Sequence, residues 1–405
     1  MILEFLLVLL VAITGAKLGG LASNRLGQPA VVGELLVGLI LGPTVLDLLH
    51  LPLFSSEHLG ETIHLLAELG VVFLMFVAGL EIELEEMASA GRVAVLAGIL
   101  GVVVPLILGA ITALPFGYSP IKSLFIGVIL TATSVSISAQ TLMELGVLRS
   151  REGIALLGAA VVDDVLVILI LSLFVALADG SGGLIDVVWV VVKMVVYLGA
   201  AAVLGVRLIP AFTRWIDRVP VSEGLLAGAI VAMLAFAWSA EALGGVALIT
   251  GAFIAGVLFA RTPLRDRIEI KMHAVAYAFF VPIFFVSIGL QANARLIGGG
   301  SLVFATLIVI VAIVSKVIGS GWGAHLAGFD SQASLRLGTG MISRGEVGLI
   351  VATVGLDNGF ISDEVFAITV VMVLATTLIT PLLLRQMFAG QPGVMHAPQP
   401  AREVE

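Results

Sequence analysis

Long apolar runs, each about the length needed to cross a bilayer, follow one another along almost the whole chain of 405 residues. A membrane-spanning helix needs about 20 predominantly apolar residues, and short polar stretches divide this chain into pieces of that size. The pattern therefore predicts an all-α polytopic membrane protein with about 13 transmembrane helices. We expect these helices near residues 2–22, 29–49, 59–80, 88–115, 119–144, 151–178, 184–212, 221–242, 244–261, 267–291, 300–326, 332–357 and 362–388.

Composition supports the same class. Hydrophobic residues make up 60% of the chain and charged residues 12%, and the mean hydropathy is +1.19. A soluble domain is about 45–50% apolar and about 25% charged. Cysteine is absent and the six histidines have no metal-site spacing, so we expect no thiol chemistry, no cofactor and no resident metal. No basic patch indicates a nucleic-acid partner; the lipid bilayer is the expected environment.

The basic residues give the orientation, because Lys and Arg favour cytoplasmic loops. Most of them lie beside the loops that follow odd-numbered predicted helices, whereas only Lys122 and Arg295 lie beside the others. Lys193, Lys316 and Arg344 fall within predicted spans. The bias predicts an N-terminus outside and a C-terminus in the cytoplasm, which suits a protein of the plasma membrane.

The second half of the sequence resembles the first. Residues 31–40 in the second predicted helix are similar to residues 249–258 in the ninth, and residues 73–80 in the third are similar to residues 283–290 in the tenth. Both pairs are separated by seven helices, and an odd offset reverses the direction through the membrane. The pattern predicts two inverted repeats, which are typical of secondary transporters with a site near the midplane.

Asp163 and Asp164 lie side by side near the middle of the predicted helix 151–178. A charge at the centre of a membrane helix costs about 2.5–3.5 kcal/mol on insertion scales, so the pair indicates a cation or proton site. A structural ion pair is the alternative interpretation. The two side chains diverge by about 100° around a helix. One aspartate can therefore pair with Lys316, the single base at a similar depth, while the other faces a watery cavity.

The fifth and twelfth predicted helices correspond in the repeats, and both are unusual. The fifth contains Thr133 and Ser134 in a run rich in hydroxyls, and the twelfth holds several glycines around Arg344 and Glu346. Such segments favour broken helices, whose free carbonyls and helix ends can hold an ion. We expect Thr133 and Ser134 to line the ion site, and Ser138 to bond back to its own helix. Arg344 and Glu346 are expected to pair with each other or with neighbouring charges.

The candidate ligands are hard oxygens, which suit alkali or alkaline-earth cations. One carboxylate among neutral oxygens favours a monovalent ion. A carboxylate that binds either a proton or a cation supplies a direct route to antiport. Glu34, Glu68, Glu81 and Glu241 are interpreted as packing or surface charges.

At these residues the chain resembles the monovalent cation:proton antiporter-2 family, and within it the NapA-type sodium/proton antiporters. The resemblance rests on the segments 162–165, 132–135 and 344–350 and on Lys316, and it covers about residues 25–388 in the same order. It implies that Asp164 binds cation and proton in turn, that Asp163 pairs with Lys316, and that Thr133 and Ser134 lie at the helix break. Additional hydroxyls at Ser136 and Ser138 depart from the family pattern and bear on ion selectivity.

The resemblance also implies a homodimer in which an ion-carrying core domain slides against a dimerisation domain, giving electrogenic exchange of sodium or lithium for protons. The expected division is 1–87 and 221–299 for the dimerisation domain, 88–178 and 300–389 for the core domain, 179–220 for a linker helix and 390–405 for a disordered cytoplasmic tail.

Four alternatives remain from the sequence. Potassium/proton exchange would use the same machinery, and a sodium-coupled organic-anion symporter would share the architecture. A channel is disfavoured because no filter sequence or ring of charges is present. A hydrolytic intramembrane aspartyl enzyme is disfavoured because adjacent aspartates on one helix diverge.

Overall fold

A computed structural model describes residues 2–51, 58–82, 90–178, 184–291 and 302–389. These residues form helices throughout, with no strand among them. The helices are α1 (Ile2–Arg25), α2 (Ala30–Leu41), η1 (Leu48–His50), α3 (Leu59–Leu80), α5 (Gly91–Ala113), η2 (Leu114–Phe116), α6 (Pro120–Thr131), α7 (Val135–Glu144), α8 (Arg151–Ala178), α9 (Leu184–Ile216), α10 (Gly224–Ser239), η3 (Ala240–Gly244), α11 (Leu248–Ala260), α12 (Arg265–Val275), η4 (Ala276–Phe280), α13 (Val281–Leu290), α14 (Leu302–Leu326), α15 (Ser331–Gly340), α16 (Glu346–Asp357) and α17 (Asp363–Phe388).

The all-α membrane fold is confirmed. Within the described ranges, 10 helical stretches are long and apolar enough to cross a membrane, and α2, α11 and most of α16 are shorter apolar helices. Each predicted segment corresponds to one helix or to two consecutive ones, except 267–291, which covers α12, η4 and α13. Large apolar side chains such as Leu3, Ile121 and Trp189 stay exposed, because lipid rather than water surrounds them. The predicted tail 390–405 lies outside the described residues.

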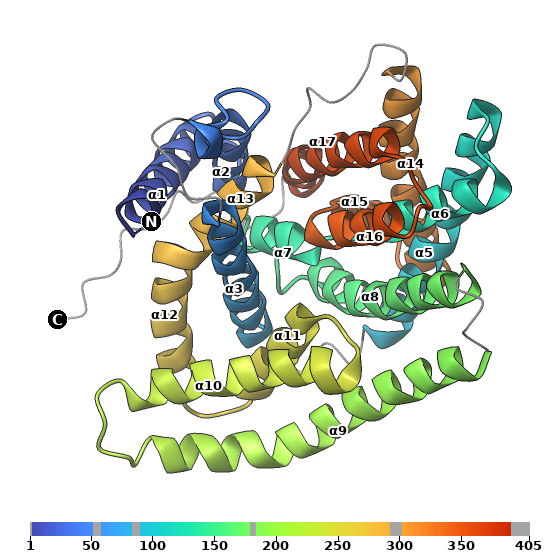
Figure 1. Ribbon diagram of the computed structural model, residues 1–405. Helices are drawn as coiled ribbons and strands as arrows, with labels where there is room; N and C mark the ends of the chain where they lie inside the picture. Colours follow the sequence, from blue (N-terminus) through green and yellow to red (C-terminus); the bar gives the residue numbers. More distant parts are fainter. Residues whose placement is uncertain (1, 52–57, 83–89, 179–183, 292–301, 390–405) are drawn as a thin grey trace.

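Two groups of helices lie side by side, and the long helix α9 runs along one edge beside α8, α10 and α11 (Figure 1). We call α1–α3 with α10–α13 the scaffold group, and α5–α8 with α14–α17 the crossing group. One cluster of buried apolar side chains lies within the crossing group and another within the scaffold group, while the largest cluster joins the two. The groups are therefore packed units that share an apolar contact surface.

Glycines that the sequence comparison aligned lie at equivalent contacts in the scaffold group. Gly38 of α2 packs against Gly289 of α13, and Gly79 of α3 packs against Gly256 of α11. A Cβ added at any of the four would lie within 2.4 Å of a backbone atom across the contact. In the aligned segments Gly38 corresponds to Gly256, and Gly79 corresponds to Gly289. The contact between α2 and α13 is therefore the counterpart of the contact between α11 and α3, as expected for inverted repeats. The repeat itself stays a prediction that this arrangement favours.

Candidate ion-binding site

Two broken helices cross in the crossing group. The first breaks between α6 and α7, where Ala132 and Ser134 have extended backbone, and the second breaks between α15 and α16. The breaks are joined directly: Ser134 N donates to Ser343 O at 2.8 Å, and Ser343 Oγ donates to Ser134 O at 2.7 Å. At each break, backbone N–H and C=O groups lose their hydrogen bonds within the helix, and groups of the opposite break replace them. In the membrane interior no water is present to do so.

The expectation for Ser138 was wrong. Its hydroxyl donates to Gly340 O of the opposite broken helix at 2.5 Å and lies 3.0 Å from Ser343 Oγ. Gly340 is the last residue of α15, so its carbonyl has no partner one turn further along the helix. Ser138 therefore stabilises the crossing itself, and sequence alone did not reveal which helix end would face it.

Arg344 also stabilises the crossing. Its fully buried guanidinium donates to Leu130 O at 2.7 Å and to Ala312 O at 3.1 Å, and it donates to Ile342 O as well. These carbonyls include the free end of α6, where a positive charge is favourable. The hydrogen bonds of Arg344 go to carbonyls, and it also attracts the Asp163 carboxylate of α8 electrostatically, so the expected interaction with a neighbouring charge stays a prediction. Glu346 begins α16, but its side chain lies outside what the structure describes.

Asp163 and Lys316 form an ion pair inside the crossing group. Lys316 Nζ of α14 lies 2.5 Å from Asp163 Oδ1 of α8, and both side chains are fully buried. α5 packs closely against α14 beside the lysine, since a Cβ added at Gly101 of α5 would lie 2.3 Å from Ser320 Oγ and 3.8 Å from Lys316 Nζ. Within the described part of the chain, Asp163 is the carboxylate at hydrogen-bond distance from the lysine, and Asp164 adds a weaker electrostatic attraction.

Two buried oxygens beside this pair lack a hydrogen-bond partner within the described residues, namely Asp163 Oδ2 and Thr133 Oγ1. The two side chains are close enough to interact electrostatically. Ser134 Oγ lies 2.9 Å from Ser136 Oγ next to them. Buried oxygens of this kind suit a weakly held water or monovalent cation, since leaving them unsatisfied is costly.

Asp164, the next residue of α8, is almost fully buried. Thr250 Oγ1 of α11 donates to Asp164 Oδ2 at 3.3 Å, so this carboxylate contacts the scaffold group across the boundary between the two groups. Sequence reasoning missed Thr250. The sequence did contain one indication of its role, because Thr250 aligns with the apolar Val32 of the first repeat.

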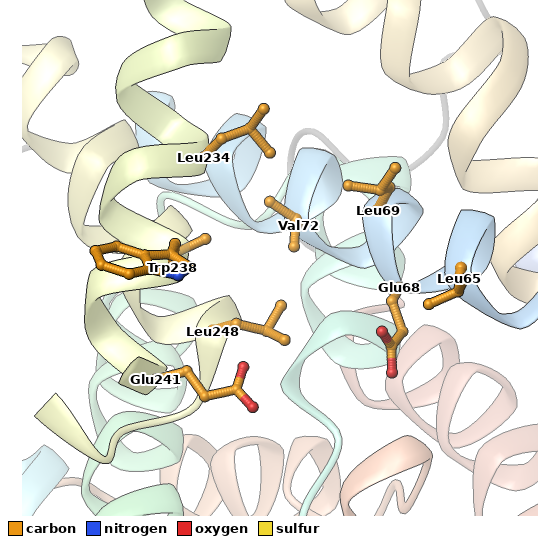
Figure 2. Close-up of a pocket in the computed structure, with 9 residues that line it drawn as sticks. Leu65, Glu68, Leu69, Val72, Leu234, Trp238, Glu241 and Leu248 are labelled. Atoms are coloured by element: carbon orange, nitrogen blue, oxygen red, sulfur yellow. The ribbon is translucent and has the colours of Figure 1, made fainter. Parts of the chain in front are cut away.

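A cavity of about 580 Å³ lies between the two groups, with α3, α11 and α13 on one side and α8 and α16 on the other. Val167 and Ile168 in its wall follow Asp164 by one helical turn, and Ile249 in the same wall precedes Thr250. Glu68 and Glu241 line both this cavity and a neighbouring one of about 430 Å³, into which both carboxylates project (Figure 2). By the charge bias, this end faces the outside.

The four glutamates set aside as packing or surface charges behave differently from one another. Glu68 and Glu241 line the cavity with exposed or partly exposed side chains, and Glu34 is 6% exposed, so the structure is compatible with surface charges at the first two and a packing charge at the third. Glu81 follows the last residue of α3 and lies near Glu269, Arg149 and Arg265.

Burial, with the Glu269 carboxylate as a smaller cause, raises the pKa of Glu81 from 4.5 to about 7. Because the folded pKa is raised, the stability that Glu81 contributes is present below about pH 4.5 and is lost as pH rises through 7. We expect the unfolding temperature of purified wild type to fall between pH 5 and 8 by about 2–4 °C more than that of Glu81→Gln. Glu61→Gln, which changes an exposed carboxylate on the same helix, should follow wild type. Parallel curves for wild type and Glu81→Gln would contradict this assignment.

We expect Thr250→Val to raise the apparent KM for the transported cation about fivefold, because a hydrogen bond to a charged group is worth about 1.5–3 kcal/mol at most and this one is long. The change is isosteric, so folding should be preserved, and Thr250→Ser should retain wild-type behaviour. Thr262→Val is the matched control, since that hydroxyl bonds only to the Phe259 carbonyl. An unchanged KM in Thr250→Val would rule out a role at the site.

A doubled carboxylate that is buried beside the crossing of two broken membrane helices, one helical turn from a cavity between two helix groups, defines an ion-coupled secondary transporter. The chain belongs to the sodium/hydrogen exchanger family, whose transmembrane region matches residues 7–390. This family consists of cation/proton antiporters rather than enzymes, so the prediction of a multi-pass membrane transporter is confirmed.

Relatives match over nearly their full length. The chain is 38% identical to the Na(+)/H(+)-K(+) antiporter GerN of Bacillus cereus, covering 97% of this chain and 99% of that one. It is 33% identical to a Na(+)/H(+) antiporter of Enterococcus hirae, covering 95% and 98%. The solved structure of the sodium proton antiporter MjNhaP1 from Methanocaldococcus jannaschii has the same fold, with a TM-score of 0.71, 18% identity and 95% of each chain covered.

Proposed function

We propose that this protein exchanges sodium or lithium for protons across the plasma membrane, with Asp164 binding the cation and the proton in turn. The observation that carries the proposal is the asymmetry of the aspartate pair. Asp163 forms a direct ion pair with Lys316, whereas Asp164 accepts a hydrogen bond from Thr250 of the other helix group and lies one helical turn from the cavity wall. An ionised Asp164 can therefore take either cation from the cavity side.

Thr133 and Ser134 supply neutral oxygens at the helix break, and the oxygens of Thr133 and Asp163 that lack a well-formed hydrogen bond within the described residues can coordinate a partly dehydrated ion beside the carboxylates. Sodium shared among one carboxylate, hydroxyls and backbone carbonyls meets its preference for hard oxygen ligands. The ion is cargo, so its ligands should be few and exchangeable.

Alternating access requires the crossing group to move relative to the scaffold group. The clusters of buried side chains within each group support an elevator motion of two rigid units, with residues 88–178 and 300–389 as the core domain and residues 1–87 and 221–299 as the dimerisation domain. In this proposal α9 links them, and two copies associate through their dimerisation domains. If sodium binding breaks the Asp163–Lys316 pair and Lys316 releases its proton, the protons of Asp164 and Lys316 are together exchanged for one sodium, which makes the exchange electrogenic.

The test is proton flux in proteoliposomes containing purified protein, with sodium, lithium, potassium or rubidium added in turn, with and without a clamped membrane potential. A response to sodium or lithium that depends on the potential is expected. A response to potassium or rubidium would favour the second candidate, potassium/proton exchange, which the Na(+)/H(+)-K(+) description of the B. cereus relative supports. No response to any alkali cation would overturn the proposal and favour a sodium-coupled organic-anion symporter.

A further inference from the structure

A second polar cluster joins the two helix groups at the end of the molecule opposite the cavity. It includes Glu144 and Gln140 of α7 in the crossing group, and Lys17, Glu34 and Tyr277 of the scaffold group. Charge orientation places this end at the cytoplasm, because α2 and α7 both meet loops on the side that carries most of the basic residues. None of these residues belongs to the ion site.

The first contact of the cluster is a helix cap supplied from the other group. The helix α2 begins after Pro29, which has no side-chain hydrogen bond to offer its first turn. Glu144 Oε2 accepts a hydrogen bond from Ala30 N at 2.5 Å, and the Val31 N–H also donates to this carboxylate. The first N–H groups of a helix need such acceptors, and a negative charge there is favourable. The last residue of α7 thus caps the first turn of α2.

Gln140, one turn earlier on α7, extends the contact to a third helix. Its Nε2 donates to Glu144 Oε1 at 2.7 Å, and its Oε1 accepts from Tyr277 Oη at 2.6 Å. Lys17 Nζ donates to the backbone oxygen of Tyr277 at 2.8 Å and lies 3.9 Å from the Glu34 carboxylate. The chain of contacts fixes the orientation of Glu144 and attaches α7 to α1, α2 and η4 at once.

α7 connects this cluster rigidly to the ion site. It begins at Val135, next to the break that presents Thr133 and Ser134, and ends at Glu144. Any sliding of the crossing group would carry Glu144 away from Ala30 and break the cap. The cavity between the two groups lies at the outer end in the same arrangement in which this inner contact is formed.

We propose that Glu144 is a positioning residue of alternating access: its cap on α2 is a latch that closes the cytoplasmic side and holds the outward-facing arrangement. The latch rests on the proposed antiport function. Releasing it shifts the balance of the two arrangements without touching the ion ligands. Since it contributes one charge-assisted contact, its loss should change the ratio of the two states by roughly ten- to a hundredfold.

The test measures the arrangement directly, without transport. The chain has no cysteine, so Ala247→Cys in the wall of the outer cavity is a single reporter for a membrane-impermeant maleimide added from outside. In Glu144→Ala we expect the labelling rate to fall roughly two- to tenfold relative to the reporter alone. Tyr277→Phe, which removes one hydroxyl and keeps the ring, should slow labelling in the same direction by a smaller factor.

Glu223→Ala is the matched control. Glu223 also lies on the side assigned to the cytoplasm and pairs with Lys271 at 2.6 Å, but both residues belong to the scaffold group, so its loss should leave labelling unchanged. Wild-type labelling in a folded Glu144→Ala protein, or equal slowing in the control, would overturn the latch. Because labelling needs no ion gradient, failure of the latch is distinguishable from failure of the antiport proposal, which only the flux assay reports. If Glu144→Ala does not fold, Tyr277→Phe with unchanged labelling would overturn the proposal on its own.

Discussion

Asp164→Asn is expected to abolish cation-dependent proton exchange while leaving the protein folded. The amide keeps the size of the carboxylate and can still accept the hydrogen bond from Thr250. It cannot carry a negative charge, so it neither releases a proton nor neutralises a cation. Losing a charged contact worth about 3 kcal/mol weakens binding by roughly 100-fold, and losing the exchangeable proton removes the coupling as well.

The measurement is sodium-driven proton flux in proteoliposomes, normalised to reconstituted protein. Asp217→Asn is the matched control, because that carboxylate pairs with Arg267 at the surface of the scaffold group, 2.8 Å away, and should leave the flux unchanged. Sodium-stabilised unfolding temperature provides a second readout, which Asp164→Asn should lose. Retained exchange in Asp164→Asn would exclude Asp164 as the carrier and direct attention to the Asp163 side of the pair.

Hydropathy predicted the helices well because the apolar length that a membrane-spanning helix needs depends only on its own segment of the sequence. About 20 apolar residues must span the bilayer whatever they pack against. The predicted 59–80 coincides with α3, and the predicted segment 119–144 differs from the pair α6 and α7 by one residue at its start. The breaks were also foreseeable, since hydroxyls around Thr133 and glycines around Arg344 oppose a continuous helix. The juxtaposition of Asp163 and Lys316 was foreseeable for another reason: a buried acid needs a base, and the chain offers one at that depth.

Contacts that depend on which helices become neighbours were not foreseeable in this way. Ser138 could bond to its own helix or to the end of another, and only the crossing geometry selects Gly340. Thr250 and Glu144 each meet a partner from the opposite helix group, more than 80 residues away in sequence. Periodicity and hydropathy carry no information on such pairings, although a polar residue at a position where the other repeat is apolar, as at Thr250, is a usable signal.

Lys316→Gln is expected to destabilise the protein strongly and to change the charge carried per cycle. The glutamine leaves Asp163 without a countercharge in a site where both side chains are fully buried. Removing one partner of a buried ion pair costs about 3–5 kcal/mol, which corresponds to a fall of about 10 °C in the unfolding temperature. Asp163 can relieve this cost by taking a proton. Neither side chain of the former ion pair is then charged, so one charge fewer moves in each transport cycle.

The double variant Asp163→Asn, Lys316→Gln separates the two effects. It removes both charges together, so most of the lost stability should return, giving a coupling energy of several kcal/mol in the double-mutant cycle. Electrogenicity should not return, because no lysine proton remains to be exchanged together with the proton of Asp164. Lys122→Gln, which changes an exposed lysine in the first turn of α6, serves as the control for both readouts. Full stability in the single variant would show that the pair does not neutralise the site. Potential-dependent flux without Lys316 would show that the pair does not carry the transported charge. If the double variant regains stability but exchanges ions without net charge movement, the same lysine has both functions. It neutralises Asp163 in the folded structure, and it is needed for charge movement during transport.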